Sequence, residues 1–194
     1  MTDEVTRRLI HMSGMAVPLA YLFGPDLVSW RVVQGFLAVA LVVVVVLEYL
    51  RLSAGLDWAI YDRLTREYEQ DNPAGYALYI VGMAVVAGSV SVGLPIDIAV
   101  PAMLMLAVGD PISGLLGSAE ASNVKQAWVL LVMFGVCTLL AAPFVPVAAA
   151  VLGGVAATFA DGVKPTIAGY VVDDNLSIPV LGAVAMWVGI LVVG

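Results

Sequence analysis

The residues of this chain that are best suited to chemistry stand where apolar runs end. One run stops at Gly109, Asp110 and Pro111, and the small residues Ser113 and Gly117 follow closely. An Asp before Pro commonly begins a helix, its carboxylate accepting hydrogen bonds from free N–H groups of the first turn. Alternatively, a carboxylate beside glycines, where backbone approaches closely, helps to hold a metal–phosphate group. Both interpretations of Asp110 stay open on these residues alone.

Two further clusters combine cations with a histidine or an acid. Arg7 and Arg8 precede His11 by four and three positions, so a helix puts all three on one face. The arginines also suit a plainer use, as positive anchors of a membrane helix. Glu48 follows a valine-rich run and stands three residues before Arg51. These two can pair locally, or Glu48 can serve as a functional acid.

The last cluster lies in the polar stretch 161–175. Asp161 stands three residues before Lys164, and the two can form a local pair. Asp174 and Asn175 precede an apolar run that begins at 178, and either can cap the last helix. Charged groups inside apolar segments cost about 2.5–3.5 kcal/mol at a helix centre and therefore mark a function or a buried pair.

Composition places these clusters in a membrane protein. Hydrophobic residues make up 62% of the 194 positions and charged residues 12%, and the mean hydropathy is +1.03, far from a soluble domain. Because a helix needs about 20 apolar residues to cross a bilayer, we expect an all-α, polytopic membrane protein with about seven transmembrane helices. The expected spans are residues 9–23, 32–52, 74–92, 96–108, 126–142, 145–160 and 178–194.

The chain is expected to form a single integral membrane domain over residues 1–194, because it has no repeat and no linker long enough to divide it. The longest polar connection, 53–72, spaces Leu56, Ile60, Leu64 and Tyr68 at four. This spacing predicts an amphipathic helix at the cytoplasmic interface. The single Cys137 lies in an apolar run, which excludes a disulfide framework.

Lysines and arginines predict the orientation in the cell membrane. With the N-terminus cytoplasmic, only Arg31 falls outside, and the other basic residues fall inside. The same alternation brings Asp110, Asp161 and Asp174 to the cytoplasmic face and puts the C-terminus outside. The net charge of −7 and the absence of a basic stripe argue against a nucleic-acid partner.

Convergence of the clusters on one face supplies the parts for phosphoryl transfer. Carboxylates bind Mg²⁺, cations neutralise the migrating charge, and an acid or a histidine orients a hydroxyl. The chain has no Walker A loop, no HExxH motif, no Gly-x-Ser-x-Gly motif and no dinucleotide fingerprint. Any nucleotide site is therefore of a less familiar kind.

At these residues the chain resembles the CTP-dependent membrane lipid kinases, the family of dolichol kinase, phytol kinase and the CTP-using diacylglycerol kinases, which is related in motif to some phosphatidate cytidylyltransferases. The matching pieces are Arg7-Arg8-x-x-His11, Glu48, Gly109-Asp110-x-x-Ser113-x-x-x-Gly117, Ala157-Thr158-x-x-Asp161, where the family usually shows Glu, and Asp174-Asn175-Leu176-x-x-Pro179. In order and approximate spacing they cover most of the chain.

The resemblance implies transfer of the γ-phosphate of CTP to a membrane lipid alcohol, of the isoprenoid or dolichol type, with Mg²⁺ as cofactor. It implies a catalytic set of His11, Glu48, Asp110 and Asp161, with His11 or Glu48 near the acceptor hydroxyl. It implies nucleotide and phosphate contacts from Arg7, Arg8, Gly109, Ser113, Gly117, Lys125 and Asn175, and metal contacts from Asp110 and Asp174.

One stretch departs from the family pattern. Where the family tends to show Lys-Ser/Thr-x-Glu-Gly, Lys125 is present, but Trp128 and Val129 stand in place of Glu and Gly. An alternative is therefore a catalytically silent paralogue that binds lipid or a membrane partner, and another is a cytidylyltransferase-like enzyme. A small transporter is a third class, but its charged residues would lie near the middle of the bilayer.

Overall fold

The chain is helical apart from one short hairpin, as seen in a computed structural model. The structure describes residues 2–55, 58, 65, 69–70, 72–117, 125–163, 166–167 and 170–193. In chain order the elements are α1 (Thr2–Ser13), α2 (Ala16–Phe23), α3 (Trp30–Ala54), α5 (Gly75–Ser89), the 3₁₀ turn η2 (Val90–Val92), α6 (Ile96–Leu104), the π-helical turn η3 (Met105–Gly109), α7 (Asp110–Leu116), α8 (Ala127–Ala141), α9 (Val147–Gly162), the antiparallel strands β1 (Thr166–Ile167) and β2 (Tyr170–Val171), and α10 (Asp174–Val193). The prediction of a helical protein is confirmed.

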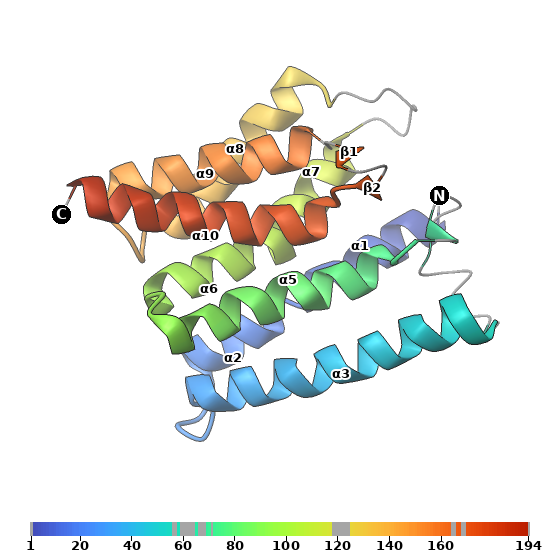
Figure 1. The fold of residues 1–194 in the computed structure, drawn as a ribbon. Helices are drawn as coiled ribbons and strands as arrows, with labels where there is room; N and C mark the ends of the chain where they lie inside the picture. The colour runs from blue at the N-terminus through green and yellow to red at the C-terminus, as the bar shows by residue number, and fades with distance from the viewer. Residues whose placement is uncertain are drawn as a thin grey trace.

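The helices run back and forth along one direction (Figure 1). Consequently α1 begins, α3 ends, α9 ends and α10 begins at the same end of the molecule, while the C-terminus lies at the other end. This arrangement gathers the polar clusters of the sequence at one end of the helices.

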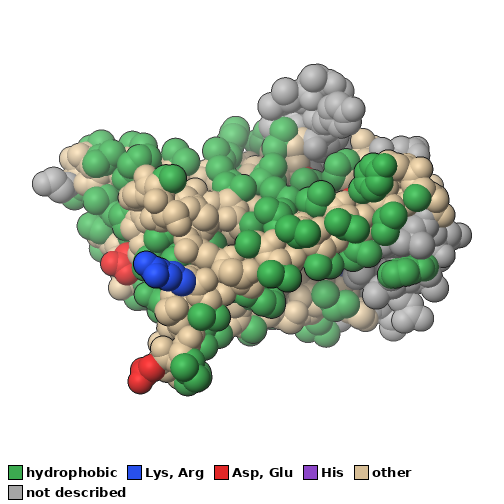
Figure 2. Space-filling view, turned by 60° about the horizontal axis from the view of Figure 1, so that its bottom comes forward, with side chains coloured by type: hydrophobic (Ala, Val, Ile, Leu, Met, Phe, Trp, Pro, Cys, Tyr) green, Lys and Arg blue, Asp and Glu red, His purple; other side chains and the backbone are tan. Residues whose placement is uncertain are grey.

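The lengths of the helices and the apolar surface of the molecule are consistent with a membrane protein. Four helical runs are long and apolar enough to cross a membrane, namely Trp30–Ala54, Gly75–Val92, Ile96–Leu116 and Asp174–Val193. α8 and α9 are also apolar but shorter, at 15 and 16 residues. Hydrophobic side chains are spread over the face seen in Figure 2, and most of the few charged ones visible there lie toward the end where Figure 1 has the C-terminus, away from the polar clusters. The count of seven spans stays a prediction.

The expected first span, 9–23, is two helices instead of one. α1 already begins at Thr2, and a turn at Gly14 separates it from α2, with the Gly14 N–H donating to the carbonyl of His11 at 3.1 Å. A Cβ added to Gly14 would lie 1.9 Å from the Tyr79 hydroxyl oxygen of α5. Glycine weakens a helix and allows close approach, so the break occurs where α5 passes closest.

The expected end of the fourth span at 108 is wrong. The helix continues without interruption from Ile96 to Leu116, and the Asp110 side chain makes no capping hydrogen bond. The π-helical turn explains how Pro111 is accommodated, because the Asp110 N–H donates to the Met105 carbonyl, five residues back. A wider turn of this kind relieves the clash between a proline ring and the preceding turn.

Small residues let α9 and α10 lie close together. A Cβ on Gly153 of α9 would meet Met186 of α10 at 2.5 Å, and a Cβ on Gly189 of α10 would meet Ala149 of α9 at 2.7 Å. Such contacts favour tight helix packing in membranes. As a result, the end of α9 and the start of α10 lie next to each other.

Most of the predicted amphipathic segment, 53–72, lies outside the described residues. α3 ends at Ala54, where Gly55 caps it in the left-handed region at a φ of 64°. Arg51 attaches the residues before α5 to α3, because it donates to the carbonyls of Glu69 (3.1 Å), Gln70 (3.0 Å) and Asn72 (2.7 Å). The start of α5 is thereby attached to the end of α3.

Candidate functional site

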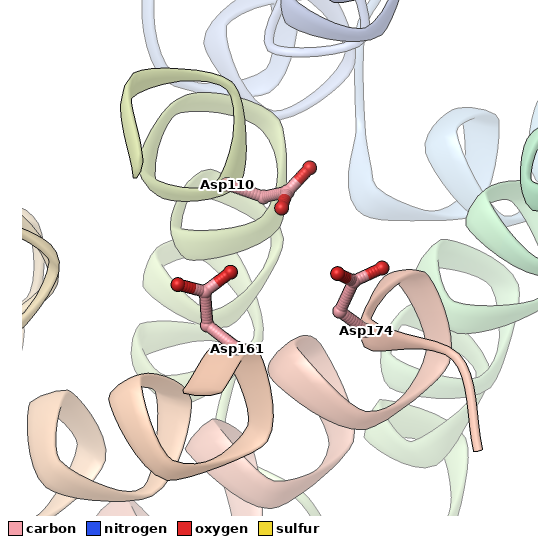
Figure 3. Close-up of side chains that lie close together, drawn as sticks. All are labelled: Asp110, Asp161 and Asp174. Carbon is pink, nitrogen blue, oxygen red and sulfur yellow. The ribbon is translucent and has the colours of Figure 1, made fainter. Parts of the chain in front are cut away.

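Three aspartates from three distant parts of the sequence meet at one point. Asp110, Asp161 and Asp174 come from α7, α9 and α10 and point toward one another (Figure 3). One carboxylate oxygen from each lies within 4.8 Å of the others, and the residues are 8%, 1% and 5% exposed. The structure therefore brings together the two predicted metal ligands and adds Asp161, which was predicted as catalytic.

The three carboxylates fit a divalent cation. Carboxylates are the ligands that Mg²⁺ prefers, and oxygens on opposite sides of one Mg²⁺ lie about 4.2 Å apart, given bonds of about 2.1 Å. The upper limit of 4.8 Å on the distances between the three oxygens is compatible with one shared ion. Like charges buried together are unfavourable unless a cation or a proton offsets them. A bound Mg²⁺ would provide that compensation.

The start of α10 leaves Asp174 available for this cluster. Asp173 caps the helix, because its Oδ1 accepts the Asn175 backbone N–H at 2.9 Å and the Asn175 side-chain amide at 2.7 Å. The expectation that Asp174 or Asn175 caps the helix is wrong, and α10 begins four residues before the expected 178. An Asx cap one position earlier explains both differences.

Asp161 is held by a partner that the sequence did not indicate. Ser113 Oγ donates to Asp161 Oδ2 at 2.6 Å, and Lys125 Nζ donates both to Ser113 Oγ at 3.1 Å and to Asp161 Oδ1. The expected local partner, Lys164, lies outside the described residues. The cation beside the aspartates therefore comes from the residues just before α8.

His11 reaches the cluster across the π-helical turn. Its Nε2 lies 3.1 Å from the Leu106 carbonyl oxygen and 3.7 Å from Asp110 Oδ2. The Leu106 carbonyl is open to this contact because Pro111, five residues later, has no N–H to donate. A carbonyl only accepts, so Nε2 carries the proton and Nδ1 is the basic nitrogen of the neutral ring.

Arg8 packs directly on α7. A Cβ on Gly114 would lie 1.6 Å from Arg8 Nη1, so the guanidinium occupies the space that any other residue at 114 would fill. Arg7 and Arg8 are both half-buried and line a cavity that also reaches Asp110. The predicted phosphate contacts Arg7 and Arg8 thus lie at the same end of the molecule as the aspartates.

A cavity of about 510 Å³ opens beside the aspartates, within the usual range for small-molecule sites. Its walls come from α1, α2, α3 and α5, together with Glu69, the start of α7 and the start of α10. Its polar lining is Arg7, Arg8, His11, Ser13, Glu69, Tyr76, Tyr79, Asp110, Asp174 and Asn175. Its other lining is small or apolar, namely Ile10, Gly14, Ala16, Val17, Phe36, Leu37, Gly75, Ile80 and Met83. One cavity thus has both a charged part and an apolar part.

Glu48 belongs to a separate network and does not line this cavity. Arg51 donates to both of its oxygens, at 3.0 and 2.7 Å, as the local-pair interpretation predicted. Glu48 also accepts the Tyr76 hydroxyl and, at 3.0 Å, the Ala74 backbone N–H. These contacts join α3 to the start of α5 and account for the buried acid without a chemical role.

Two glycines predicted to contact phosphate have evident structural surroundings. A Cβ on Gly109 would lie 2.9 Å from Cys137 Sγ and 3.1 Å from Met133 Sδ, so Gly109 lets α8 approach. Gly117 ends α7, and its N–H donates to the Ser113 carbonyl at 2.9 Å. Neither lines the cavity, and their phosphate contacts stay predictions.

Sequence reasoning missed Gly14 and Tyr79, which lie inside apolar runs and carry no charge. Tyr79 packs edge-on against the His11 ring, with centroids 4.3 Å apart. A single tyrosine in an apolar span does not indicate a functional site by itself, and its position beside a histidine is evident only in the folded chain. Trp128 and Val129, which depart from the family pattern, lie in the first turn of α8, where Val129 is fully buried.

Comparison of the whole chain with protein-family models, with curated proteins and with solved structures finds no match.

Proposed function

We propose that this chain is an enzyme of the cell membrane that transfers the γ-phosphate of CTP to a lipid alcohol at the cytoplasmic face, with Mg²⁺ held by Asp110, Asp161 and Asp174. The observation that carries the proposal is the meeting of three buried carboxylates, two of which, Asp110 and Asp174, line the charged part of a cavity that also has apolar walls. Carboxylates that hold Mg²⁺ are suited to binding a triphosphate, and the apolar walls of the cavity are suited to a lipid tail.

The cations around the cluster support the donor side of the reaction. Lys125 donates a hydrogen bond to Asp161, and Arg7 and Arg8 line the cavity. In phosphoryl transfer, bound Mg²⁺ and fixed cations stabilise charge on the moving group. The bond between the γ-phosphorus and its bridging oxygen breaks, and a bond to the lipid oxygen forms. CDP leaves, and the hydroxyl proton passes to a base, for which His11 Nδ1 is suited.

Orientation and topology belong to the same proposal. With about seven spans and the N-terminus cytoplasmic, the aspartates lie at the face where cytosolic CTP is present. Arg7, Arg51 and Lys125 support this orientation, because Arg7 lines the cavity with Asp110, Arg51 donates to the carbonyl of the cavity residue Glu69, and Lys125 donates to Asp161.

The test uses the purified full chain in liposomes at high salt, with Mg²⁺, a long-chain isoprenoid alcohol and CTP labelled at either the α or the γ phosphate. We expect Mg²⁺-dependent label in the lipid from the γ position only. Label from the α position would instead identify a cytidylyltransferase. No label from either position, in a chain that is folded by its thermal transition, would contradict the proposal and favour the silent paralogue.

A matched pair of variants ties the activity to the cluster. Asp110→Asn removes one carboxylate charge and is expected to lower transfer by about 100-fold or more. Asp97→Asn changes an exposed aspartate in the first turn of α6, at the opposite end of the same helical run, and is expected to leave transfer unchanged. Equal activity in both variants would contradict the assignment.

A further inference from the structure

The cavity beside the aspartates contains two buried polar atoms that lack partners. Within the described part of the chain, Tyr79 Oη and Asn175 Oδ1 make no hydrogen bond. Both residues line the cavity, at 9% and 8% exposure. Burying a polar atom without a partner costs about 1–3 kcal/mol, so unsatisfied atoms of residues that line a cavity indicate a ligand with a complementary group.

A hydroxyl is a group that complements both atoms. The Asn175 side-chain oxygen only accepts, whereas the Tyr79 hydroxyl both donates and accepts. By hydrogen-bonding type, an alcohol group can donate to Asn175 and accept from Tyr79. Both residues line the same cavity as His11 and Asp110, which is where an acceptor oxygen would have to lie.

The rest of the cavity matches an apolar chain. It follows the second half of α1 and the start of α2, from Arg7 to Val17. Leu37 and Met83, each 1% exposed, form its inner wall. Phe36 and Ile10 also line it and are 58% and 54% exposed, so the cavity reaches the apolar outer surface of the helices.

We infer that this cavity is the acceptor site: a lipid alcohol enters sideways from the bilayer beside Phe36 and Ile10, its tail lies along α1, α2 and α3, and its hydroxyl is held by Tyr79 and Asn175. Gly14 leaves the space that the Tyr79 hydroxyl occupies. The inference rests on the proposed function for the reaction that follows binding. It assigns Tyr79, which the sequence motifs do not include, and it places Asn175, predicted to contact the nucleotide, at the acceptor hydroxyl.

The experiment measures binding without CTP or metal. The full chain in liposomes is photolabelled with a long-chain isoprenoid alcohol that carries a diazirine near its hydroxyl, and the labelled peptides are mapped by mass spectrometry. The same probe with a methyl ether in place of the hydroxyl is the chemical control. We expect label on cavity-lining residues of α1, α2, α3 and α5, displaced by the free alcohol but not by the ether.

Two matched pairs of variants test the residues. Tyr79→Phe removes one hydrogen-bonding hydroxyl and should weaken displacement by the alcohol about fivefold. Tyr21→Phe alters a tyrosine that packs on Trp30 outside the cavity, and it should leave displacement by the alcohol unchanged. Gly14→Ala places a methyl group against Tyr79 and should reduce labelling, whereas Gly35→Ala, with open space around it, should not.

Each outcome separates this inference from the proposed function. Label confined to lipid-facing residues outside the cavity, or equal displacement in Tyr79→Phe and the native chain, would overturn the acceptor site. A chain that phosphorylates the alcohol but is labelled elsewhere would overturn the acceptor site alone. A chain that is labelled in the cavity but transfers nothing from CTP would support the acceptor site and overturn the proposed reaction.

Discussion

The Asp161 carboxylate shows how a charged group is tolerated in an apolar chain. It is 1% exposed, yet it receives hydrogen bonds from Ser113 and Lys125. A buried charge without such partners is strongly unfavourable. Lys125 therefore has two consequences: it offsets the charge of Asp161, and it puts a cation beside the oxygens that would bind Mg²⁺ and the triphosphate.

Changing Lys125 tests this pairing. Lys125→Gln leaves Asp161 without its cation and removes a positive charge from the proposed donor site, so we expect the KM for CTP to rise about tenfold. Steady-state transfer at varied CTP measures it. Arg31→Gln, an exposed cation at the opposite end of α3, should leave the KM unchanged. Equal KM values in the two variants would contradict a role for Lys125 at the donor site.

At the scale of elements, the ends of helices decide which side chains meet. The ends of most apolar runs are predictable: the expected 32–52 and 126–142 correspond to Trp30–Ala54 and Ala127–Ala141. The exceptions are local. Pro111 does not stop its helix, because a π-helical turn absorbs it, and Asp173 starts α10 early. Both depend on backbone hydrogen bonds that hydropathy does not report.

Glu48 joins two elements, and its substitution separates a structural role from a catalytic one. Glu48→Gln keeps the side chain's shape but loses the charge that Arg51 pairs with, so we expect a lower melting temperature, with transfer by the folded fraction within about tenfold of native. Thermal unfolding in detergent and the labelled-CTP assay measure the two effects.

The opposite result would restore Glu48 to the catalytic set. If Glu48→Gln unfolds at the native temperature but transfers nothing, the acid acts in chemistry and not in attaching α5 to α3. Tyr76→Phe probes the same junction: it removes the hydroxyl that donates to Glu48 and leaves the Arg51 pair in place.

At the scale of the whole molecule, the packing of the helices creates a carboxylate cluster and a cavity that no single segment contains. The sequence predicts Asp110 and Asp174 as metal ligands because each carboxylate stands at the end of an apolar run. It does not predict the cavity, because Tyr79, Gly14 and Phe36 belong to different helices and become neighbours of one space only when the bundle forms. Apolar runs reveal which residues are helical but not which faces meet.

The central claim is that the three aspartates bind one divalent cation, and Mn²⁺ binding followed by electron paramagnetic resonance tests it most directly. With the full chain in liposomes and saturating CTP, we predict one tightly bound Mn²⁺ in the native chain and in Asp97→Asn. In Asp110→Asn and Asp174→Asn, the Kd should rise by about 100-fold. Native affinity for Mn²⁺ in both cluster variants would contradict the account.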